Sequence, residues 1–558
     1  MIETNFIAPV IRRAAEKPDH PTLTFIAEDG AETVVTAAQF HRRATGTAAA
    51  LRAVGIAPDD LVILVLKHSQ QLLSAFWGAL YLGAIPSIFP FLTEKLDPAL
   101  YMERVKTLVT HSGARAVVTY AEFRDTLADL LKDADCRVLT TEEMPEAADA
   151  NFAAPEVTAE KIAFLQHSSG TTGLQKGVAL SHRAVLNQIS AYGNAIELNQ
   201  HDVVASWLPL YHDMGLIAGF VMPIVAGTPL VLMSPFHWVR DPKILLWAIH
   251  RHKATLAWLP NFAYNHIART ARPAGLEGLD LSSWRMVINC SEPAYHASHS
   301  AFLEKLTPYG LRPEALAVSY AMAENTFAVT QTVPGAPPRL DWVNIAVLQS
   351  ERKAVAAEAG SAGTTVMVSC GAPIEGTEVR VLDATGAPLG ERQVGELAVR
   401  SNCMLSGYYK RPDLDAETLV EGWYRTGDMG YLADGEVFIT GRMKDLIIVG
   451  GKNVYPQDLE AIANHTPGIV PGRAAAFGLM DERIGSEVVV MVAERMNGAE
   501  ARDPAEIERD LRQRIVQETE VTLADMRLVD ERWLIKTSSG KVARGDNRAK
   551  YLREFRGQ

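Results

Sequence analysis

Cysteine is scarce in this sequence. Four cysteines are scattered among 558 residues, at Cys136, Cys290, Cys370 and Cys403. None forms a CxxC pair, and none stands with a histidine at the spacing of a zinc site. We therefore expect neither a disulfide framework nor a structural zinc, and a reducing, cytoplasmic setting is the simplest one.

A surplus of basic residues is also missing. Lys and Arg total 54 against 66 Asp and Glu, which gives a formal net charge of −12. Phosphate backbones and anionic lipid surfaces repel a chain of this charge. We therefore expect no nucleic-acid partner, although local basic sites remain possible.

One charge-free run is long enough to need an interpretation. Met214 to Met233 contains no charged residue over twenty positions, which is the length of a transmembrane helix. The run also contains Pro223, Gly227 and Pro229, so we predict a buried helix, a glycine turn and a buried strand, and no membrane span. The N-terminus has no basic stretch before an apolar run, and no secretory signal is expected.

The length of the chain exceeds one ordinary core and predicts about three or four folding units. Strand-like and helix-like segments alternate in the first part, as at residues 61–66 and 70–81, a pattern typical of parallel sheets with helical crossovers. Strand signals dominate later, for example at 377–382. We expect an α/β protein with a large N-terminal domain, 1–441, and a small α+β C-terminal domain, 442–558.

The run SSGTTGLQKG has the composition of a phosphate-binding loop. Glycines let the backbone approach an anion, hydroxyls donate to its oxygens, and a lysine adds charge. The spacing differs from the Walker A motif, because Lys176 precedes Gly177 and not Ser or Thr. A flexible turn is the alternative, but predicted strands on both sides favour a positioned loop. Its residues include Ser168, Ser169, Gly170, Thr171, Thr172 and Gly173.

Further motifs follow along the chain, and their order is informative. They are Tyr211 to Gly215 (YHDMG), Ser319 to Glu324 (SYAMAE), Tyr424 to Asp428 (YRTGD), Gly441 to Asp445 (GRMKD) and Thr537 to Lys541 (TSSGK). Together with the glycine-rich loop, they resemble the motifs of the adenylate-forming superfamily, which includes acyl-CoA synthetases, peptide-synthetase adenylation domains and luciferases. The resemblance covers nearly the whole chain.

The resemblance implies a fold and a set of roles. The large domain would contain two α/β sheet subdomains and a β-rich subdomain, the small domain would be mobile, and the reaction would use ATP and Mg2+. The catalytic residues would be Lys541, Lys176 and His212, the metal ligands Glu324 and Thr172, and the hinge Lys444. Nucleotide contacts would come from Ser168, Ser169, Gly170, Thr171, Thr172, Gly173, Ser291, Glu292, Ser319, Tyr320, Ala321, Met322, Asp428 and Arg442.

The chemistry explains why such residues would be needed. A carboxylate that attacks the α-phosphate of ATP must approach another anion, so cations and hydroxyls must surround the reacting atoms. Taken alone, Lys541 reads as a solvated lysine in a basic tail and Glu324 as a surface residue. His212 next to Asp213 also suggests a metal ligand or general base, but a carboxylate that is already ionised needs no strong base. A positioning role for His212 fits better.

Within the superfamily, the sequence resembles fatty acyl-AMP ligases, which transfer the acyl group to an acyl carrier protein. An insertion at about 333–367 supports this, because such ligases have extra sequence there, and it would restrain the small domain. The acyl pocket implied by the resemblance comprises His212, Met214, Gly215, Asn261, Cys290 and Ala321. Cys290 and Ala321 depart from the usual residues, which leaves the identity of the acyl chain open.

Two alternatives remain beside the leading interpretation of ATP-dependent fatty-acid activation for a carrier protein. One is a soluble acyl-CoA synthetase. The other is a catalytically silent protein that binds an acyl group or a nucleotide. The joint presence of Lys176, Glu324, Asp428 and Lys541 argues against the silent protein.

Overall fold

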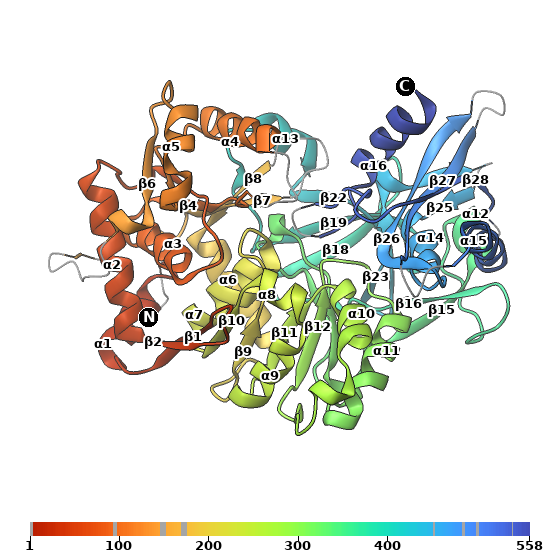
Figure 1. The fold of residues 1–558 in the computed structure, drawn as a ribbon, viewed down its shortest axis with the longest axis horizontal. Helices are drawn as coiled ribbons and strands as arrows, with labels where there is room; N and C mark the ends of the chain where they lie inside the picture. Colours follow the sequence, from red (N-terminus) through yellow and green to blue (C-terminus); the bar gives the residue numbers. More distant parts are fainter. Residues whose placement is uncertain are drawn as a thin grey trace.

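The fold is seen in a computed structural model that describes residues 4–92, 98–144, 152–153, 155–168, 176–449, 452–481, 486–497, 502–519, 521–537 and 540–557. Figure 1 shows several α/β layers side by side, with the C-terminal part of the chain at one end. The predicted alternation of strands and helices is confirmed.

A mostly parallel sheet forms the lower centre of the view in Figure 1. Its described strands, in spatial order, are β13 (Leu316–Ser319), β12 (Met286–Cys290), β11 (Leu256–Leu259), β9 (Val204–Ser206), β10 (Leu230–Met233), β1 (Pro21–Ile26) and β2 (Glu32–Thr36). The helices between them include α7 (Met222–Ala226), α8 (Pro235–Arg240), α9 (Lys243–His252), α10 (Asn261–Thr270) and α11 (His296–Leu306). Strands β9 to β13 are almost entirely buried, which explains their continuous apolar sequences.

A second sheet has the same character. Its described strands, in spatial order, are β20 (Gly407–Tyr408), β8 (Lys176–Ser181), β7 (Ile162–Ser168), β4 (Ile85–Ile88), β3 (Leu61–Leu64), β5 (Ala116–Thr119) and β6 (Arg137–Thr140). Its helices are α2 (Ala37–Ala53), α3 (Gln70–Leu82), α4 (Pro98–Ser112) and α5 (Ala121–Leu130), while α1 (Ala8–Glu16) packs on α2 and α6 (His182–Ala195) follows β8.

The segment at 214–233 folds as predicted. It forms the π-helix η2 (Met214–Val221), then α7, a left-handed Gly227 and the strand β10. All of η2 is buried in the main hydrophobic core.

Antiparallel strands follow the two parallel sheets. They are β18 (Thr377–Leu382), β19 (Gly395–Ser401), β21 (Leu419–Val420), β22 (Trp423–Ala433) and β23 (Glu436–Arg442). The predicted insertion forms a hairpin of β15 (Leu340–Asn344) and β16 (Thr364–Val368), with α12 (Ile345–Glu351) after β15; β14 (Thr330–Gln331) and β17 (Ala372–Pro373) pair beside it.

The C-terminal part of the chain has a hydrophobic cluster of its own. Its elements are η7 (Met443–Asp445), β24 (Ile447–Val449), β25 (Lys452–Val454), α14 (Pro456–Asn464), β26 (Ile469–Asp481), β27 (Ser486–Arg495), α15 (Pro504–Thr519), β28 (Leu523–Val529) and α16 (Arg544–Tyr551). Strands β26 to β28 form a sheet that α14 and α15 cover, which makes this part α+β. The predicted large N-terminal and small C-terminal regions are both present.

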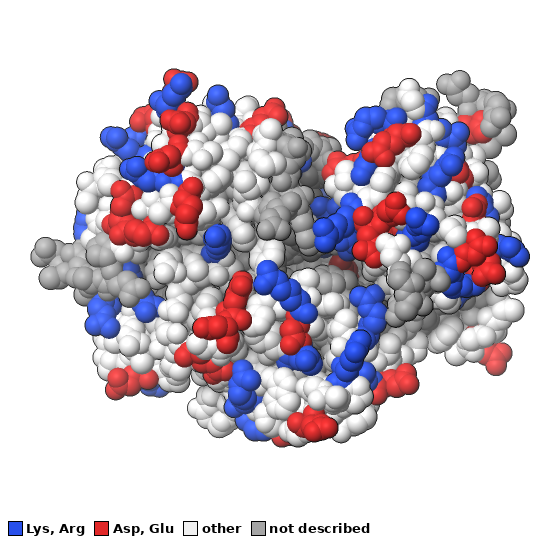
Figure 2. Space-filling view, in the orientation of Figure 1, with Lys and Arg blue, Asp and Glu red and all other residues white. Residues whose placement is uncertain are grey.

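Acidic and basic side chains are interspersed on the face shown in Figure 2. Many charged side chains of the described residues pair across short distances, for example Arg400 with Glu378 at 2.7 Å and Arg495 with Asp530 at 2.7 Å. Exposed pairs of this kind stabilise a fold by no more than about 1 kcal/mol each. The charge of this face therefore says little about stability.

We expect the turn at Gly371 to be sensitive to substitution. Gly371 has a φ of 82°, and an added Cβ would collide with the Gln331 carbonyl. Gly335 is a matched control, because its φ is 77° but nothing lies within 4 Å of an added Cβ. Gly371→Ala should lower the free energy of unfolding by about 3 kcal/mol or more, and Gly335→Ala by about 1 kcal/mol. Urea unfolding followed by circular dichroism measures both; equal losses would contradict this reading of the turn.

Candidate active site

Three neighbouring parallel strands end at one edge of the first sheet. β11, β12 and β13 pair in register and end at Leu259, Cys290 and Ser319. Ligands of open α/β sheets bind outside the carboxyl ends of the strands. The predicted site residues that follow these ends therefore come together: Asn261, Cys290, Ser291, Glu292, Ser319, Tyr320, Ala321 and Met322.

Hydrogen bonds fix the loops at this edge. Ser291 has a φ of 67°, which is rare for a residue with a side chain. Glu292 Oε2 accepts a bond from the Phe262 N–H at 2.9 Å. The Asn261 side chain, predicted to line an acyl pocket, is buried and accepts a bond from Asn289 Nδ2 at 3.0 Å. Asn261 thus acts as a junction between loops in this structure.

Asp428 lies between a phenol and a guanidinium. Tyr320 donates its hydroxyl to Asp428 Oδ2 at 2.7 Å, and Arg442 Nε donates to Asp428 Oδ1 at 2.9 Å. The pairing of β22 with β23 sets Asp428 opposite Arg442. The Asp428 charge raises the pKa of the Arg442 guanidinium above its ordinary value. Three residues predicted to hold the nucleotide are thus in direct contact.

Glu324 is held by a pair of tyrosines. It lies in the short turn η6 (Ala323–Asn325), and Tyr408 donates its hydroxyl to Glu324 Oε1 at 2.8 Å. The Tyr408 and Tyr424 hydroxyls are 2.7 Å apart. Lys176 Nζ lies 5.0 Å from the centre of the Tyr408 ring. The pairing of β8 with β20 brings Lys176 next to the Tyr408 ring. The hydroxyl of the same tyrosine binds Glu324, the predicted metal ligand.

His212 and Asp213 are presented by a tight turn before η2. An added Cβ at Gly215 would collide with the Pro209 carbonyl, so the turn requires glycine there. His212 Nδ1 is 2.5 Å from Asp213 Oδ1, and the same oxygen accepts the Met214 N–H at 2.8 Å. His212, Met214 and Gly215 of the predicted acyl pocket are thus consecutive parts of one rigid turn.

Lys541 reaches the edge of the first sheet from the C-terminal part of the chain. The Thr537 N–H donates to the Lys541 carbonyl at 2.8 Å. Burial lowers the pKa of the Lys541 amine, as does the nearby Arg442, whereas Glu292 and Asp213 raise it. Although burial tends to raise the pKa of Asp213, His212 and Lys541 hold it below its ordinary value. Lys541 therefore stands among charged groups of the N-terminal part.

The predicted hinge residue lies in η7, between β23 and β24. Partial burial and the charge of Arg442 lower the pKa of Lys444. Lys444 also interacts electrostatically with Asp428 and Lys176. The connector between the two parts of the chain is thus next to the groups around Asp428.

Part of the predicted phosphate loop lies outside the described residues, namely Ser169, Gly170, Thr171, Thr172 and Gly173. Ser168 ends β7 and Lys176 begins β8, and the two are paired in the antiparallel ladder. The two predicted flanking strands are present, and the roles of the loop residues remain predictions.

The sequence motifs did not single out three residues of this site. Asp213 was considered only as a neighbour of His212, and Tyr408 and Tyr424 were given no role. Two short strands, β8 and β20, bring Tyr408 to Glu324. This contact depends on the pairing of two strands that lie far apart in the chain, so the local sequence contains no signal for it.

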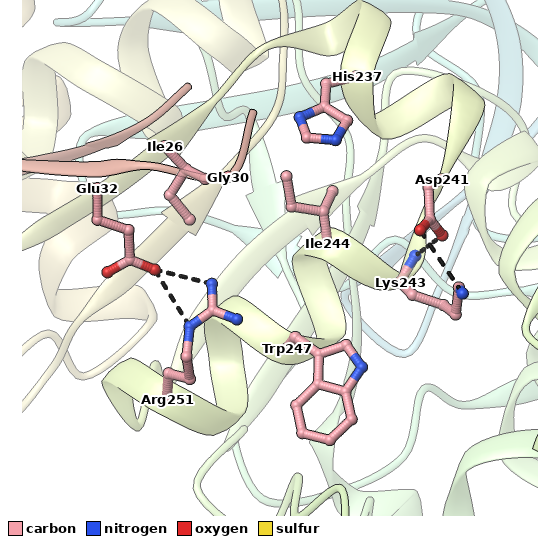
Figure 3. Close-up of a pocket in the computed structure, with 9 residues that line it drawn as sticks. All are labelled: Ile26, Gly30, Glu32, His237, Asp241, Lys243, Ile244, Trp247 and Arg251. Carbon is pink, nitrogen blue, oxygen red and sulfur yellow. Dashed lines mark hydrogen bonds and ion pairs between the residues drawn. The ribbon is translucent and has the colours of Figure 1, made fainter. Parts of the chain in front are cut away.

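A separate open pocket of about 480 Å3 lies between the β1–β2 hairpin and helices α8 and α9. Figure 3 shows its acidic and basic side chains in pairs: Arg251 donates to Glu32 at 2.8 Å, and Lys243 lies 3.6 Å from Asp241. None of the predicted site residues lines this pocket. It is therefore distinct from the site at the strand ends.

The described ranges contain no group of three or more His, Cys, Asp or Glu side chains arranged to hold a metal ion. Nor does any helix within them combine the length and apolar character that crossing a membrane requires.

Comparisons with known proteins agree on one family. The family described as AMP-binding enzyme matches residues 10–409. A putative acyl-CoA synthetase of Caulobacter vibrioides is 32% identical over 519 residues, covering 92% of this chain and 90% of the relative. The medium-chain-fatty-acid–[acyl-carrier-protein] ligase JamA of Moorena producens is 30% identical over 513 residues, covering 88% and 86%.

A solved structure has the same fold along its whole length. It comes from studies of fatty acyl-adenylate ligases of E. coli and L. pneumophila, and it superposes with a TM-score of 0.90. The two chains are 27% identical, and the match covers 100% of this chain and 98% of the other. The arrangement of large and small regions is thus common to both proteins.

We expect the phenol of Tyr408 to stabilise the site. Tyr408→Phe removes the hydrogen bond to Glu324, which should cost about 1 kcal/mol of unfolding free energy. The adjacent Tyr409, which is only half-buried, provides the control Tyr409→Phe. The free energies of unfolding of the two variants, measured in urea, should differ by about that amount. If Tyr408→Phe is as stable as the control, the hydrogen bond to Glu324 does not stabilise the fold.

Proposed function

Because the chain belongs to the family of AMP-binding enzymes, we propose that it activates a medium- or long-chain fatty acid with ATP. The product is an acyl-adenylate, pyrophosphate is released, and the acyl group then passes to an acyl carrier protein. The observation that carries the proposal is that the segment carrying Lys541 comes to the strand ends, since a Cβ placed on Gly540 would lie 4.0 Å from Phe262 at the start of α10. An ammonium group at that place suits a reaction between two anions.

The adenylation step needs no covalent enzyme intermediate. A carboxylate oxygen of the acid forms a bond to the α-phosphorus, and the bond from that phosphorus to the pyrophosphate oxygen breaks. Negative charge gathers on the phosphate oxygens. Lys541 would bridge the acid and the α-phosphate, and Lys176 would bind the departing pyrophosphate. Preorganised cations of this kind lower the barrier because they need no rearrangement during the reaction.

Asp428 and Arg442 suit the ribose. The Asp428 carboxylate, oriented by Tyr320 and Arg442, presents oxygens that can accept the two ribose hydroxyls. The Tyr320 ring, together with Ser319, Ala321 and Met322, would lie along the adenine. Ser291 and Glu292 follow the neighbouring strand and would complete the nucleotide site.

Glu324 fits Mg2+ as a single hard oxygen ligand. The described residues gather no cluster of carboxylates there, and Mg2+ commonly takes one or two carboxylates plus phosphate oxygens and waters. When bound, the ion would neutralise phosphate charge. The Tyr408 hydroxyl fixes the Glu324 carboxylate for this role, and Thr172 is proposed to assist.

His212 is proposed to position the acid. Asp213 Oδ1 lies 2.5 Å from its Nδ1 atom, and an added Cβ at Gly215, just after both residues, would collide with the Pro209 carbonyl. The residues proposed to line the acyl pocket are His212, Met214, Gly215, Asn261, Cys290 and Ala321.

The insertion supports transfer to a carrier protein. Asn453 donates to the Gln349 carbonyl at 2.8 Å and accepts a bond from Arg352 at 3.0 Å. Tyr455 shares a buried cluster with Leu348 of α12. We propose that these contacts restrain a small domain, 442–558, which turns about Lys444 relative to the domain 1–441. The relative JamA is named a ligase of an acyl carrier protein.

An acyl-CoA synthetase is the second candidate, and the name of the Caulobacter relative favours it. Products from a mixed fatty-acid pool with ATP, analysed by mass spectrometry with CoA or with a carrier protein, distinguish the two. Rapid release of acyl-CoA would overturn the assignment to a carrier protein, and no acyl-adenylate from any acid would favour a silent binding protein. The unpaired cysteines support a reducing, cytoplasmic setting.

We expect Lys541→Ala to reduce acid-dependent exchange of labelled pyrophosphate into ATP by about 100-fold or more, because a preorganised charge is lost. The exposed Lys132 gives the control Lys132→Ala, which should retain full activity. If Lys541→Ala exchanges pyrophosphate into ATP at the control rate, Lys541 has no role in the reaction.

We expect loosening of the insertion to increase formation of acyl-CoA. Asn453→Ala removes two hydrogen bonds to the insertion, each worth about 1 kcal/mol, and deletion of residues 339–367 removes the whole contact. Both should raise the ratio of CoA thioester to acyl-adenylate, the deletion more strongly. Lys353→Ala, at an exposed position of the insertion, is the control. Unchanged product ratios in both variants would count against a restraining role.

A further inference from the structure

An arginine shortly after Lys541 binds two carboxylates from different elements. Arg544 is the first residue of α16. Its Nη1 atom donates to Asp445 Oδ2 at 2.7 Å, and its Nε and Nη2 atoms donate to the two carboxylate oxygens of Glu460 at 2.8 and 2.6 Å. The three side chains are no more than 22% exposed. Because a planar guanidinium binds carboxylates directionally, Arg544 fixes the start of α16 relative to both elements.

The segment from Thr537 to Lys541, called the lysine loop below, is closed at its base. The Ala543 N–H donates to the Ile535 carbonyl at 3.1 Å. The side chain of Asn547, in α16, donates to the same carbonyl at 2.8 Å and accepts the Ile535 N–H at 2.8 Å. The position of the lysine loop therefore follows that of α16.

Asp445 stands next to the proposed hinge. Before Lys444, Arg442 at the end of β23 donates to Asp428 Oδ1 at 2.9 Å, which fastens it to β22 of the N-terminal part. After Lys444, Asp445 is fastened to α16 by Arg544 at 2.7 Å. Two guanidinium–carboxylate pairs thus lie on either side of the hinge, one in each part of the chain. If both pairs persist, a turn of the small domain has to take place between them.

Glu460 links Arg544 to a second contact with the N-terminal part. It lies in α14, one turn after Gln457, whose carbonyl accepts the Tyr295 hydroxyl at 3.2 Å. The Gln457 side chain donates to the Thr440 carbonyl at 2.5 Å. Tyr295 precedes α11 and Thr440 lies in β23, so both partners belong to the N-terminal part. Arg544 is therefore linked to that part through α14 as well as through the hinge.

We propose that Arg544 is a positioning residue for adenylation, which sets the place of the lysine loop relative to the ribose site at Asp428. The inference rests on the proposed function, because that function gives Lys541 its reaction. Arg544 acts through the loop and needs no contact with the substrates. A misplacement of a reacting group by about 1 Å can slow a reaction by about 100-fold, so the bonds of Arg544 to Asp445 and Glu460 bear directly on the rate.

The substitution Arg544→Lys tests the proposal. It retains the charge but cannot bind both carboxylates through a planar fork. We expect kcat for pyrophosphate exchange into ATP to fall about tenfold or more, because Lys541 is misplaced in the transition state. KM for ATP and for the acid should stay within about twofold of the wild type. The exposed Arg553 of η9 (Leu552–Arg556) supplies the matched control Arg553→Lys, which should retain full activity.

Asp445→Asn tests the contact beside the hinge. It removes the charge but keeps the size of the side chain, so kcat should fall while KM stays unchanged. Because both substitutions weaken one contact, the double variant Asp445→Asn/Arg544→Lys should be about as slow as the slower single variant. Losses that multiply would show that the two residues act independently and would overturn the proposal. Asp445→Glu, which retains the charge, should keep more of kcat than Asp445→Asn.

Hydrogen exchange followed by mass spectrometry gives a readout that does not depend on activity. We expect the amides of η7 and α16 to exchange faster in Arg544→Lys and Asp445→Asn than in the wild type and in Arg553→Lys, because a link between the two elements is lost. Strand β27, between β26 and β28 in the C-terminal sheet, reports general stability and should exchange at the wild-type rate.

The outcomes separate the two proposals. Wild-type kcat in Arg544→Lys would overturn the inference. A loss of kcat with faster hydrogen exchange throughout the C-terminal part, β27 included, would also overturn it, because Arg544 would then have a merely structural role. If the wild type lacks acid-dependent pyrophosphate exchange but hydrogen exchange in η7 and α16 rises in both variants, the proposed function fails and the link between hinge and lysine loop stands.

Discussion

The transfer of a lysine ammonium out of water and into a site that already contains a guanidinium is the constraint that the structure has to meet. An isolated buried charge is strongly unfavourable, and a second like charge adds to the penalty. The protein meets it with fixed anions: Asp428 accepts from Arg442 at 2.9 Å, and the charges of Glu292 and Asp213 raise the pKa of Lys541. The C-terminal part of the chain is thus placed against the N-terminal part by charge as well as by shape.

Carboxylates that accept a hydrogen bond from a phenol recur in this structure. Tyr320 donates to Asp428, Tyr408 to Glu324, and Tyr431 to Asp341 at 2.7 Å. A phenol is a neutral donor, so it orients a carboxylate without cancelling its charge. The first two pairs belong to the proposed nucleotide site, where an anion must be held still and yet remain available to a ligand. The third pair joins Asp341 of the insertion to Tyr431 of β22 and stabilises the fold there.

The sequence predicted the layers of the fold better than their contacts. Apolar runs such as 61–66 predicted buried strands because parallel strands are covered on both faces. The charge-free segment at 214–233 was correctly assigned to a helix, a turn and a strand, since its prolines and glycine exclude a continuous span. Motifs located the strand ends at which Cys290 and Ser319 stand.

Contacts between distant segments were beyond the reach of the sequence. The pairing of β8 with β20, which brings Lys176 to Tyr408, follows from the register of strands and has no local signal. The same holds for the electrostatic interaction of Asp213 with Lys541, which joins two distant segments of the chain. The extra length near 333–367 indicated an insertion, but nothing in its composition identified Asn453 as the residue that it binds.

The burial of Tyr455 has a consequence for timing. This residue of the C-terminal part is 3% exposed and shares a cluster with Val343, Leu348 and Phe438 of the N-terminal part. Any large turn about Lys444 must first pull an aromatic ring out of a packed core, at a cost of up to about 3 kcal/mol for a fully buried side chain. Such a step would slow the proposed turn of the small domain, so an acyl-adenylate made in the present arrangement would remain in it longer before the domain moves.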